Sequence, residues 1–133
     1  MKKDDSETTS FSLFLVLSWW HTATFRSNVN IEWYDEKSLC IVLCSKGYPD
    51  KFEKNIIIEN IDQINLNKNE YIYHAGTTKN LNKIYSNGGR VLNFVTLSNS
   101  FRKSQKNSID LIKKLNWSNG FYRKDIGYKV INS

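Results

Sequence analysis

Short apolar runs, several of them alternating with polar residues, follow one another along the chain. A period of two is typical of a strand with one buried face, and Val29, Ile31 and Trp33 follow it. The run from Leu39 to Cys44 is apolar throughout, which predicts a strand buried on both faces. The predicted strands cover residues 28–33, 39–44, 56–58, 63–66, 70–75, 82–85 and 90–97.

The last two of these strands flank a turn sequence, Asn87-Gly88-Gly89. Asn-Gly and Gly-Gly pairs are strong hairpin signals because two-residue primed turns need positive φ angles. The sequence therefore predicts a tight hairpin of residues 82–85 with 90–97, and Arg90 at its base. From these residues alone, a solvated arginine on a surface hairpin is the simpler interpretation.

One helix is predicted, over residues 101–115, where apolar and small residues recur at steps of three and four. Ser98, Asn99 and Ser100 offer N-cap oxygens ahead of it, and Gly120 is a plausible C-terminal cap. The face predicted to be buried comprises Phe101, Ser104, Ser108, Leu111, Ile112 and Leu115. An extended segment is predicted to follow, from Phe121 to Ile131. The pattern as a whole indicates an α+β domain, mostly antiparallel β, with five to seven short strands and one main helix.

The chain is basic, with 19 Lys and Arg against 13 Asp and Glu and a formal net charge of +6 over 133 residues. Such a charge would suit an anionic partner such as a nucleic acid, a phosphorylated metabolite or a membrane surface. The lysines are scattered, however, and the composition rich in Asn, Lys and Ile is what an AT-biased genome encodes. The predicted helix has a basic side, which is usually a solvated face and less often a nucleic-acid contact. That side comprises Arg102, Lys103, Lys106, Lys113 and Lys114.

Two cysteines and two histidines give no metal or disulfide pattern. Cys40 and Cys44 stand four residues apart in one predicted strand, roughly 13 Å from each other, whereas a disulfide needs Cα atoms within about 7 Å. Neither His21 nor His74 joins them at a metal-ligand spacing. We therefore expect free buried thiols, a reducing cytoplasmic location, no metal site, and a structural role for His74. No phosphate loop, carboxylate pair or nucleophile elbow is present, so no catalytic residues are predicted.

The first 27 residues differ from the rest. The apolar run Phe11–Trp20 is about half the length that a membrane-spanning helix needs. Asp4, Asp5 and Glu7 do not fit the basic start of a secretory signal, and no convincing cleavage site follows Trp20. We expect no membrane segment, and a core helix or a patch that faces another domain instead.

Four motifs carry a resemblance to a known family. Leu39–Pro49, Tyr73–Thr77, Ser86–Leu92 and Phe121–Tyr128 are similar, in order and spacing, to the C-terminal domain of phosphoribosylamine–glycine ligase, also called glycinamide ribonucleotide synthetase. The resemblance runs from about residue 28 to residue 131, roughly four fifths of the chain. It implies a rudimentary single-hybrid-like, or barrel-sandwich-like, C-terminal domain of an ATP-grasp ligase. It also implies two segments: a divergent or frame-disturbed leader over residues 1–27, and the C-terminal domain over residues 28–133.

The resemblance further implies the activity of the parent enzyme. Family members use ATP and Mg²⁺ or Mn²⁺ to convert glycine to glycyl phosphate in purine biosynthesis. The amine of 5-phosphoribosylamine then attacks this acyl phosphate, giving glycinamide ribonucleotide, ADP and phosphate. The metal neutralises phosphate charge, while the protein holds amine and acyl phosphate in line.

The resemblance places the domain's contribution at the substrate phosphate. Arg90 is then the candidate contact, since a guanidinium binds phosphate bidentately, and Gly88 and Gly89 let backbone N–H groups approach it. A structural salt bridge from Arg90 to a carboxylate is the alternative. For Arg123, Lys124 and Asp125, an ion pair that helps domain packing is the simpler expectation.

The chain also departs from the family pattern. Family members are normally much longer, with an N-terminal domain and an ATP-grasp body, and their signature Arg-x-Gly-Asp-Pro-Glu-x-Gln keeps only Asp5 and Glu7 here. The family's metal-binding Glu and Asn lie upstream of that signature, so no residue corresponds to them. We expect a fragment that is inactive alone, binds neither ATP nor metal by itself, and depends on an ATP-grasp body in the same or a separate chain. The alternative is a free-standing basic β-rich module that binds nucleic acid or a partner protein.

Overall fold

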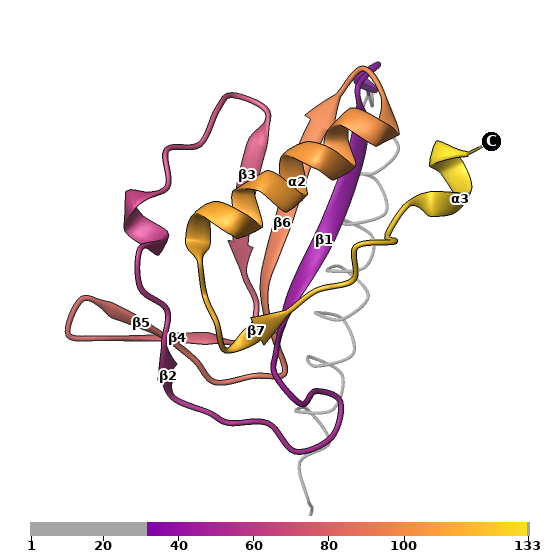
Figure 1. Ribbon diagram of the computed structural model, residues 1–133. Coiled ribbons are helices and arrows are strands. Elements are labelled where there is room, and N and C mark those ends of the chain that lie inside the picture. The colour runs from indigo at the N-terminus through magenta and orange to yellow at the C-terminus, as the bar shows by residue number, and fades with distance from the viewer. Residues whose placement is uncertain (1–31, 133) are drawn as a thin grey trace, which may run out of the picture. The chain divides into compact units, whose positions relative to one another are not determined.

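The computed structural model describes residues 32–132, and from Tyr34 onward the chain forms one compact unit (Figure 1). In this part the strands are β1 (Lys37–Ser45), β2 (Ile56–Ile57), β3 (Glu70–His74), β4 (Thr77–Asn80), β5 (Lys83–Ser86), β6 (Arg90–Ser98) and β7 (Gly120–Phe121). The helices are the 3₁₀ helix η1 (Ile61–Gln63), α2 (Phe101–Leu115) and the short α3 (Tyr128–Ile131). The predicted α+β class, mostly antiparallel with one main helix, is confirmed.

The larger sheet has the strand order β3-β6-β1-β7, with every neighbouring pair antiparallel. Its long central strands β1 and β6 alternate buried and accessible residues. Leu39, Ile41 and Leu43 of β1 lie in the core, where they meet Leu92 and Phe94 of β6. Helix α2 crosses β1 and β6 on this buried face (Figure 1).

Strand β1 is therefore buried on one face, and the prediction of two buried faces was wrong. Cys40 is exposed, while Val42 and Cys44 are half-buried. An unbroken apolar run cannot by itself distinguish a central strand covered on both sides from one covered on a single side. Both cysteines are free thiols as expected, but the expectation that they are buried was wrong.

Residues next to helix α2 in the sequence cap both of its ends. Ser100 caps the N-terminus through its Oγ, which accepts from the Lys103 N–H at 3.3 Å. Asn116, in the left-handed region at φ 50°, ends the helix, so Gly120 is not the cap and lies in β7 instead. The predicted buried face is confirmed for Ser104, Ser108, Leu111, Ile112 and Leu115, with Phe101 half-buried.

Buried hydroxyl groups attach α2 to the larger sheet. The Thr96 Oγ1 donates to the Ser104 carbonyl at 2.6 Å, so the Ser108 hydroxyl, 2.9 Å away, must donate to Thr96. Ser104 Oγ in turn donates to the Lys37 carbonyl at 2.7 Å and lies 2.8 Å from Ser98 Oγ. These polar groups are buried yet satisfied, which is the condition for tolerating them in a core.

The smaller sheet has the order β2-β5-β4, also antiparallel. Strands β4 and β5 form its hairpin through Leu81 and Asn82, both with positive φ (44° and 61°). Two consecutive positive φ angles are what a two-residue primed turn requires. Trp117, after α2, donates from Nε1 to the Ile57 carbonyl at 3.1 Å, which connects the segment between α2 and β7 to the smaller sheet.

The predicted hairpin of residues 82–85 with 90–97 was wrong. Strand β5 pairs with β4 and β2, whereas β6 pairs with β1 and β3. The segment of Asn87, Gly88 and Gly89 is a connection between two sheets, and neither glycine has a positive φ. The hairpin turn instead uses Leu81, which is unfavoured in the left-handed region and gives no signal in the sequence.

Other predicted elements also differ from the structure. The weak strand over 63–66 is replaced by η1 and an irregular segment, and Phe121–Ile131 contains a helix, α3, instead of one extended segment. Strand β4 was not predicted. Trp33 lies outside any strand and is 87% exposed. Residues 28–31 of the predicted strand over 28–33 lie outside the described residues. So do the apolar run Phe11–Trp20 and the whole leader over 1–27.

Candidate functional site

A cavity of about 520 Å³ lies where the two sheets meet. It includes all three residues predicted for the phosphate site, Gly88, Gly89 and Arg90. The other residues that line it are Val42, Tyr48, Ala75, Gly76 and Asn93. Sequence reasoning missed these five, although Val42, Tyr48, Ala75 and Gly76 stand within the motifs that carry the family resemblance.

A β-bulge decides which face of the sheet Arg90 occupies. Strands β1 and β6 are in simple register as far as Leu43 opposite Leu92, but the next residue, Cys44, is opposite Arg90. Val91 is thus an extra residue, and both Val91 and Leu92 are fully buried. Without it, strict alternation would place Arg90 on the buried face with Leu92. Bulges commonly redirect a side chain in this way, and here Arg90 joins Val42 and Asn93 on the face opposite α2.

Close backbone contact accounts for the glycines of the site. A Cβ on Gly76 would lie 2.5 Å from the Arg90 carbonyl oxygen and 2.7 Å from the Gly88 Cα. The Gly76 carbonyl accepts from the N–H groups of Asn87 and Gly88, at 2.8 and 3.0 Å. These distances leave no room for a side chain, so two chain segments cross in direct backbone contact. The glycines serve this crossing and not the positive-φ turn predicted from the sequence.

Residues at the end of β1 hold the same glycines from another side. Ser45 N–H donates to the Gly89 carbonyl at 2.8 Å, and Ser45 Oγ donates to the Gly88 carbonyl at 3.0 Å. Ser45 is 3% exposed, so these bonds are shielded from competing water. Both carbonyls are therefore occupied. The Gly89 N–H, in contrast, has no acceptor among residues 32–132.

Arg90 is exposed and has no carboxylate partner in the described part of the chain. The salt bridge considered as the alternative role for Arg90 does not form with any of these residues. Its positive charge acts on Cys44, the opposing residue of β1. Burial raises the pKa of the Cys44 thiol, and the Arg90 charge acts in the opposite direction. Partial desolvation raises the pKa of the Cys40 thiol.

The other residues singled out in the sequence do not line this cavity. His74 Nδ1 is 2.9 Å from Thr77 Oγ1, across the turn from β3 to β4. Arg123 binds Asp125 with two contacts, Nε to Oδ1 at 3.0 Å and Nη2 to Oδ2 at 2.6 Å. This bidentate hydrogen bonding lowers the pKa of Asp125 and raises the pKa of Arg123. Both side chains are exposed, and the two residues are only two positions apart in the sequence.

Residues 32–132 contain neither a cluster of metal-ligating side chains nor a membrane-spanning helix. No group of three His, Cys, Asp or Glu side chains is close enough there to hold a metal ion. No helix within the same range is long and apolar enough to cross a membrane.

The family model "Phosphoribosylglycinamide synthetase, C domain" matches residues 38–129. The chain therefore belongs to this family of ligase C-terminal domains.

Individual relatives agree with this assignment. The chain is 37% identical over 101 residues to a phosphoribosylamine–glycine ligase of Fusobacterium nucleatum, which covers 75% of this chain and 24% of the relative. It is 42% identical over 103 residues to the enzyme of the same name from Pseudomonas syringae, with 77% and 24% covered. The crystal structure of phosphoribosylamine–glycine ligase from Thermotoga maritima matches with a TM-score of 0.55 and 28% identity, over 68% of this chain and 22% of that one. The chain thus spans about a quarter of the length of the curated relatives it matches.

Proposed function

We propose that this chain provides the C-terminal domain of a phosphoribosylamine–glycine ligase, an enzyme of purine biosynthesis. The family match over residues 38–129 and the names of the relatives support this. The complete reaction joins glycine to 5-phosphoribosylamine through glycyl phosphate, with ATP as the phosphate donor. We propose that the fold is of the rudimentary single-hybrid type and that the domain begins at residue 28. We also propose that the protein is cytoplasmic.

Within that reaction, we assign to the cavity the 5′-phosphate of phosphoribosylamine. The unpaired guanidinium of Arg90 is the observation that carries this assignment, because it lies beside Gly88 and Gly89 in a cavity with no carboxylate partner among the described residues. A free guanidinium and an unoccupied N–H such as that of Gly89 are donors suited to a phosphate. Positioning a phosphate holds the distant amine in place and so lowers the entropic part of the barrier.

The remaining parts of the active site are proposed to come from an ATP-grasp body in the same or a separate chain. ATP and Mg²⁺ or Mn²⁺ would bind there, since residues 32–132 offer no group of metal-ligating side chains. Residues 32–132 also offer no lysine-bearing phosphate loop in their sequence. The chain is therefore proposed to be inactive when it is assayed alone.

The test is a chimera in which residues 28–133 replace the matching C-terminal part of the Fusobacterium nucleatum ligase. We expect the chimera to form glycinamide ribonucleotide from glycine, phosphoribosylamine and ATP. Arg90→Ala in the chimera should raise the KM for phosphoribosylamine at least about tenfold, the cost of one charged hydrogen bond to phosphate. The KM for ATP should not change.

Lys124→Ala is the matched control, because it also removes one exposed positive charge but lies outside the cavity. It should leave both KM values unchanged. An Arg90→Ala chimera with the parental KM for phosphoribosylamine would refute the phosphate assignment. A folded chimera with no turnover would refute the proposal that this chain supplies a working ligase domain.

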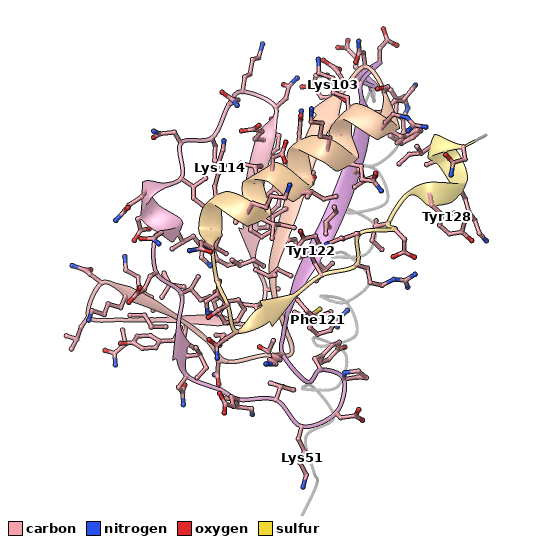
Figure 2. All side chains as sticks on the ribbon, in the orientation of Figure 1. Lys51, Lys103, Lys114, Phe121, Tyr122 and Tyr128 are labelled. Atoms are coloured by element: carbon pink, nitrogen blue, oxygen red, sulfur yellow. The ribbon has the colours of Figure 1, made fainter. Side chains whose placement is uncertain are left out.

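A nucleic-acid-binding module is the second candidate, favoured by the exposed basic side chains of α2. Lys103 and Lys114 lie near opposite ends of this helix (Figure 2). The exposed tyrosines Tyr71 and Tyr73, which stack on each other at 6.2 Å, lie on the opposite face of the larger sheet. Base stacking and backbone contact on one surface need aromatic and basic residues together. Retention on a polyanion column that disappears at modest salt, with base-dependent tyrosine quenching, would favour this second function.

A further inference from the structure

We infer that Tyr48 is a positioning residue that holds Arg90 at the phosphate site. This inference rests on the proposed function, because it assigns to Tyr48 an action through Arg90 on the same ligand. Tyr48 lies in the loop after β1 and is half-buried in the wall of the cavity. Three steps lead from its ring to the Arg90 side chain.

The first step is the contact between the Tyr48 ring and Gly89. A Cβ on Gly89 would lie 2.0 Å from Tyr48 Cδ2, 2.5 Å from Cε2 and 3.0 Å from Cγ. The ring therefore lies against the Gly89 backbone, at the side where any other residue would carry its side chain. Gly89 has an ordinary φ, so its lack of a side chain serves this ring contact.

The second step is the anchoring of Tyr48 itself. Its N–H donates to the Ser45 carbonyl at 3.1 Å, and Asp50 N–H donates to the Gly47 carbonyl at 3.0 Å, so the loop is a closed turn. The Tyr48 ring also meets the Phe52 ring edge-on, with centroids 6.1 Å apart and planes at 65°, an arrangement that aromatic pairs favour. The Phe52 ring therefore supports the Tyr48 ring.

The third step is the short path from Gly89 to Arg90. Ser45 binds both glycine carbonyls from β1, Gly76 contacts Gly88, and Tyr48 covers Gly89. The backbone of Gly88 and Gly89, just before Arg90, is thus contacted by three separate residues. Because the long arginine side chain amplifies small backbone rotations, loss of one support should spread the guanidinium over many positions. Preorganisation of this kind is what makes a donor effective toward an anion.

The experiment uses the isotope-labelled full chain in five forms: wild type, Tyr48→Phe, Tyr48→Ala, Arg90→Ala and the double variant Tyr48→Ala/Arg90→Ala. Tyr128→Ala is the control for loss of a tyrosine ring. Tyr128 lies on α3, far from Lys51 in the loop that carries Tyr48 (Figure 2), and it does not line the cavity. Two quantities are measured by NMR: hydrogen exchange of the Ser45 and Gly88 amides, and the Kd for ribose 5-phosphate, with ribose and inorganic phosphate in parallel.

We expect Tyr48→Ala to accelerate exchange at Ser45 and Gly88, while Tyr48→Phe and Tyr128→Ala match the wild type because the supporting ring at Gly89 remains. Tyr48→Ala should weaken ribose 5-phosphate binding about tenfold and ribose binding not at all. In the Arg90→Ala background the same change should have almost no further effect, since Tyr48 acts through Arg90.

The outcomes separate the two proposals. Unchanged amide exchange in Tyr48→Ala would overturn the positioning role, whatever the ligand does. A full tenfold loss from Tyr48→Ala on top of Arg90→Ala would also overturn it, because Tyr48 would then contact the ligand itself. The proposed phosphate site would be contradicted if ribose 5-phosphate did not bind the wild type, or bound Arg90→Ala equally well. The role of Tyr48 would then be decided by the amide exchange alone.

Discussion

At the residue scale, Arg90 owes its location to a single extra residue in β6. The bulge at Val91 places two consecutive side chains in the core, and Arg90 emerges opposite Cys44 on the other face. A strand without the bulge would have placed this charge on the buried face, with Leu92 and next to Leu43, where an unpaired charge is not tolerated. The position of the guanidinium is therefore a property of strand register.

The pairing of Arg90 with Cys44 predicts a change in thiol reactivity. The Arg90 charge lowers the pKa of Cys44 against the effect of burial, so Arg90→Gln should raise that pKa. The rate of thiol alkylation against pH, measured in a Cys40→Ser background to isolate one thiol, should shift to higher pH. An identical profile in the two proteins would mean that the guanidinium does not act on this thiol.

The bidentate pair of Arg123 and Asp125 predicts a second, independent titration. The Arg123 hydrogen bonds lower the pKa of Asp125, so the stability that this group contributes is complete above the ordinary carboxyl pKa and is lost as the pH falls through the lowered folded value. Arg123→Ala should raise the pKa of Asp125 toward that of a free carboxyl group, as followed by carboxyl carbon NMR. Lys124→Ala should leave the pKa of Asp125 unchanged. A large rise of this pKa in the Lys124→Ala control would show that the general positive charge, and not the ion pair, lowers it.

At the scale of single elements, the attachment of α2 to the sheet depends on buried hydroxyl groups. Thr96→Val removes the oxygen that accepts from Ser108 and leaves that hydroxyl buried without a partner. We expect a loss of about 1–3 kcal/mol in the free energy of unfolding, the cost of an unsatisfied buried polar group. Urea unfolding of the full chain measures it.

The double variant Thr96→Val/Ser108→Ala provides the matched control. Removing both partners leaves no orphaned hydroxyl, so the double variant should be less destabilised than the sum of the two single changes. A strictly additive loss would contradict the hydrogen bond between the two side chains.

The accuracy of prediction differed between kinds of element for a physical reason. The boundaries and buried face of α2 were predicted well because helical hydrogen bonds and caps are local, within four residues of each other. Most strand segments were also located. Their partners were not, because β6 pairs with β1, far away in the chain, and β5 pairs with β4 across a turn that has no clear sequence signal. Asn87-Gly88-Gly89 gave a stronger local turn signal than Leu81-Asn82, where the turn lies.

At the scale of the whole molecule, the crossing of Gly76 and Gly88 joins the two sheets. Gly76 leads from β3 of the larger sheet to β4 of the smaller, and Gly88 leads from β5 back to β6. Both glycines also line the cavity. This backbone contact is thus part of both the connection between the sheets and the lining of the site.

Gly76→Ala should therefore damage stability and the site together. Its methyl group would meet the Arg90 carbonyl and the Gly88 Cα, both backbone atoms that cannot turn aside. We expect a loss of about 1–3 kcal/mol or more, seen as a lower urea midpoint, with altered amide shifts at Gly88 and Arg90. Thr78→Ala, an exposed change in the neighbouring strand β4, should change neither quantity, and a Gly76→Ala protein of wild-type stability would show that the crossing can open without cost.

Part of the candidate site could be predicted from the sequence because three of its residues are neighbours in the chain. Arg90, Gly88 and Gly89 were identified because they stand together in one motif of seven residues, and they do line one cavity. Val42, although it lies in the motif Leu39–Pro49, and Asn93 join them through strand pairing, and no local pattern marks either one as a site residue. Tyr48 and Gly76 stand in recognisable motifs, but only the distances to Gly89 and Gly88 show what they do there.

By itself, the sequence determined the class of the domain, the location of its helix, the free state of its cysteines and the family to which it belongs. These depend on composition, on local periodicity and on short motifs, all of which are properties of neighbouring residues. Only the tertiary structure decided that Gly88 and Gly89 form a crossing and no hairpin, that a bulge directs Arg90 away from the core, and that Tyr48 covers Gly89. Those features arise from contacts between segments distant in the chain, where register and excluded volume, and not local preference, determine which atoms meet.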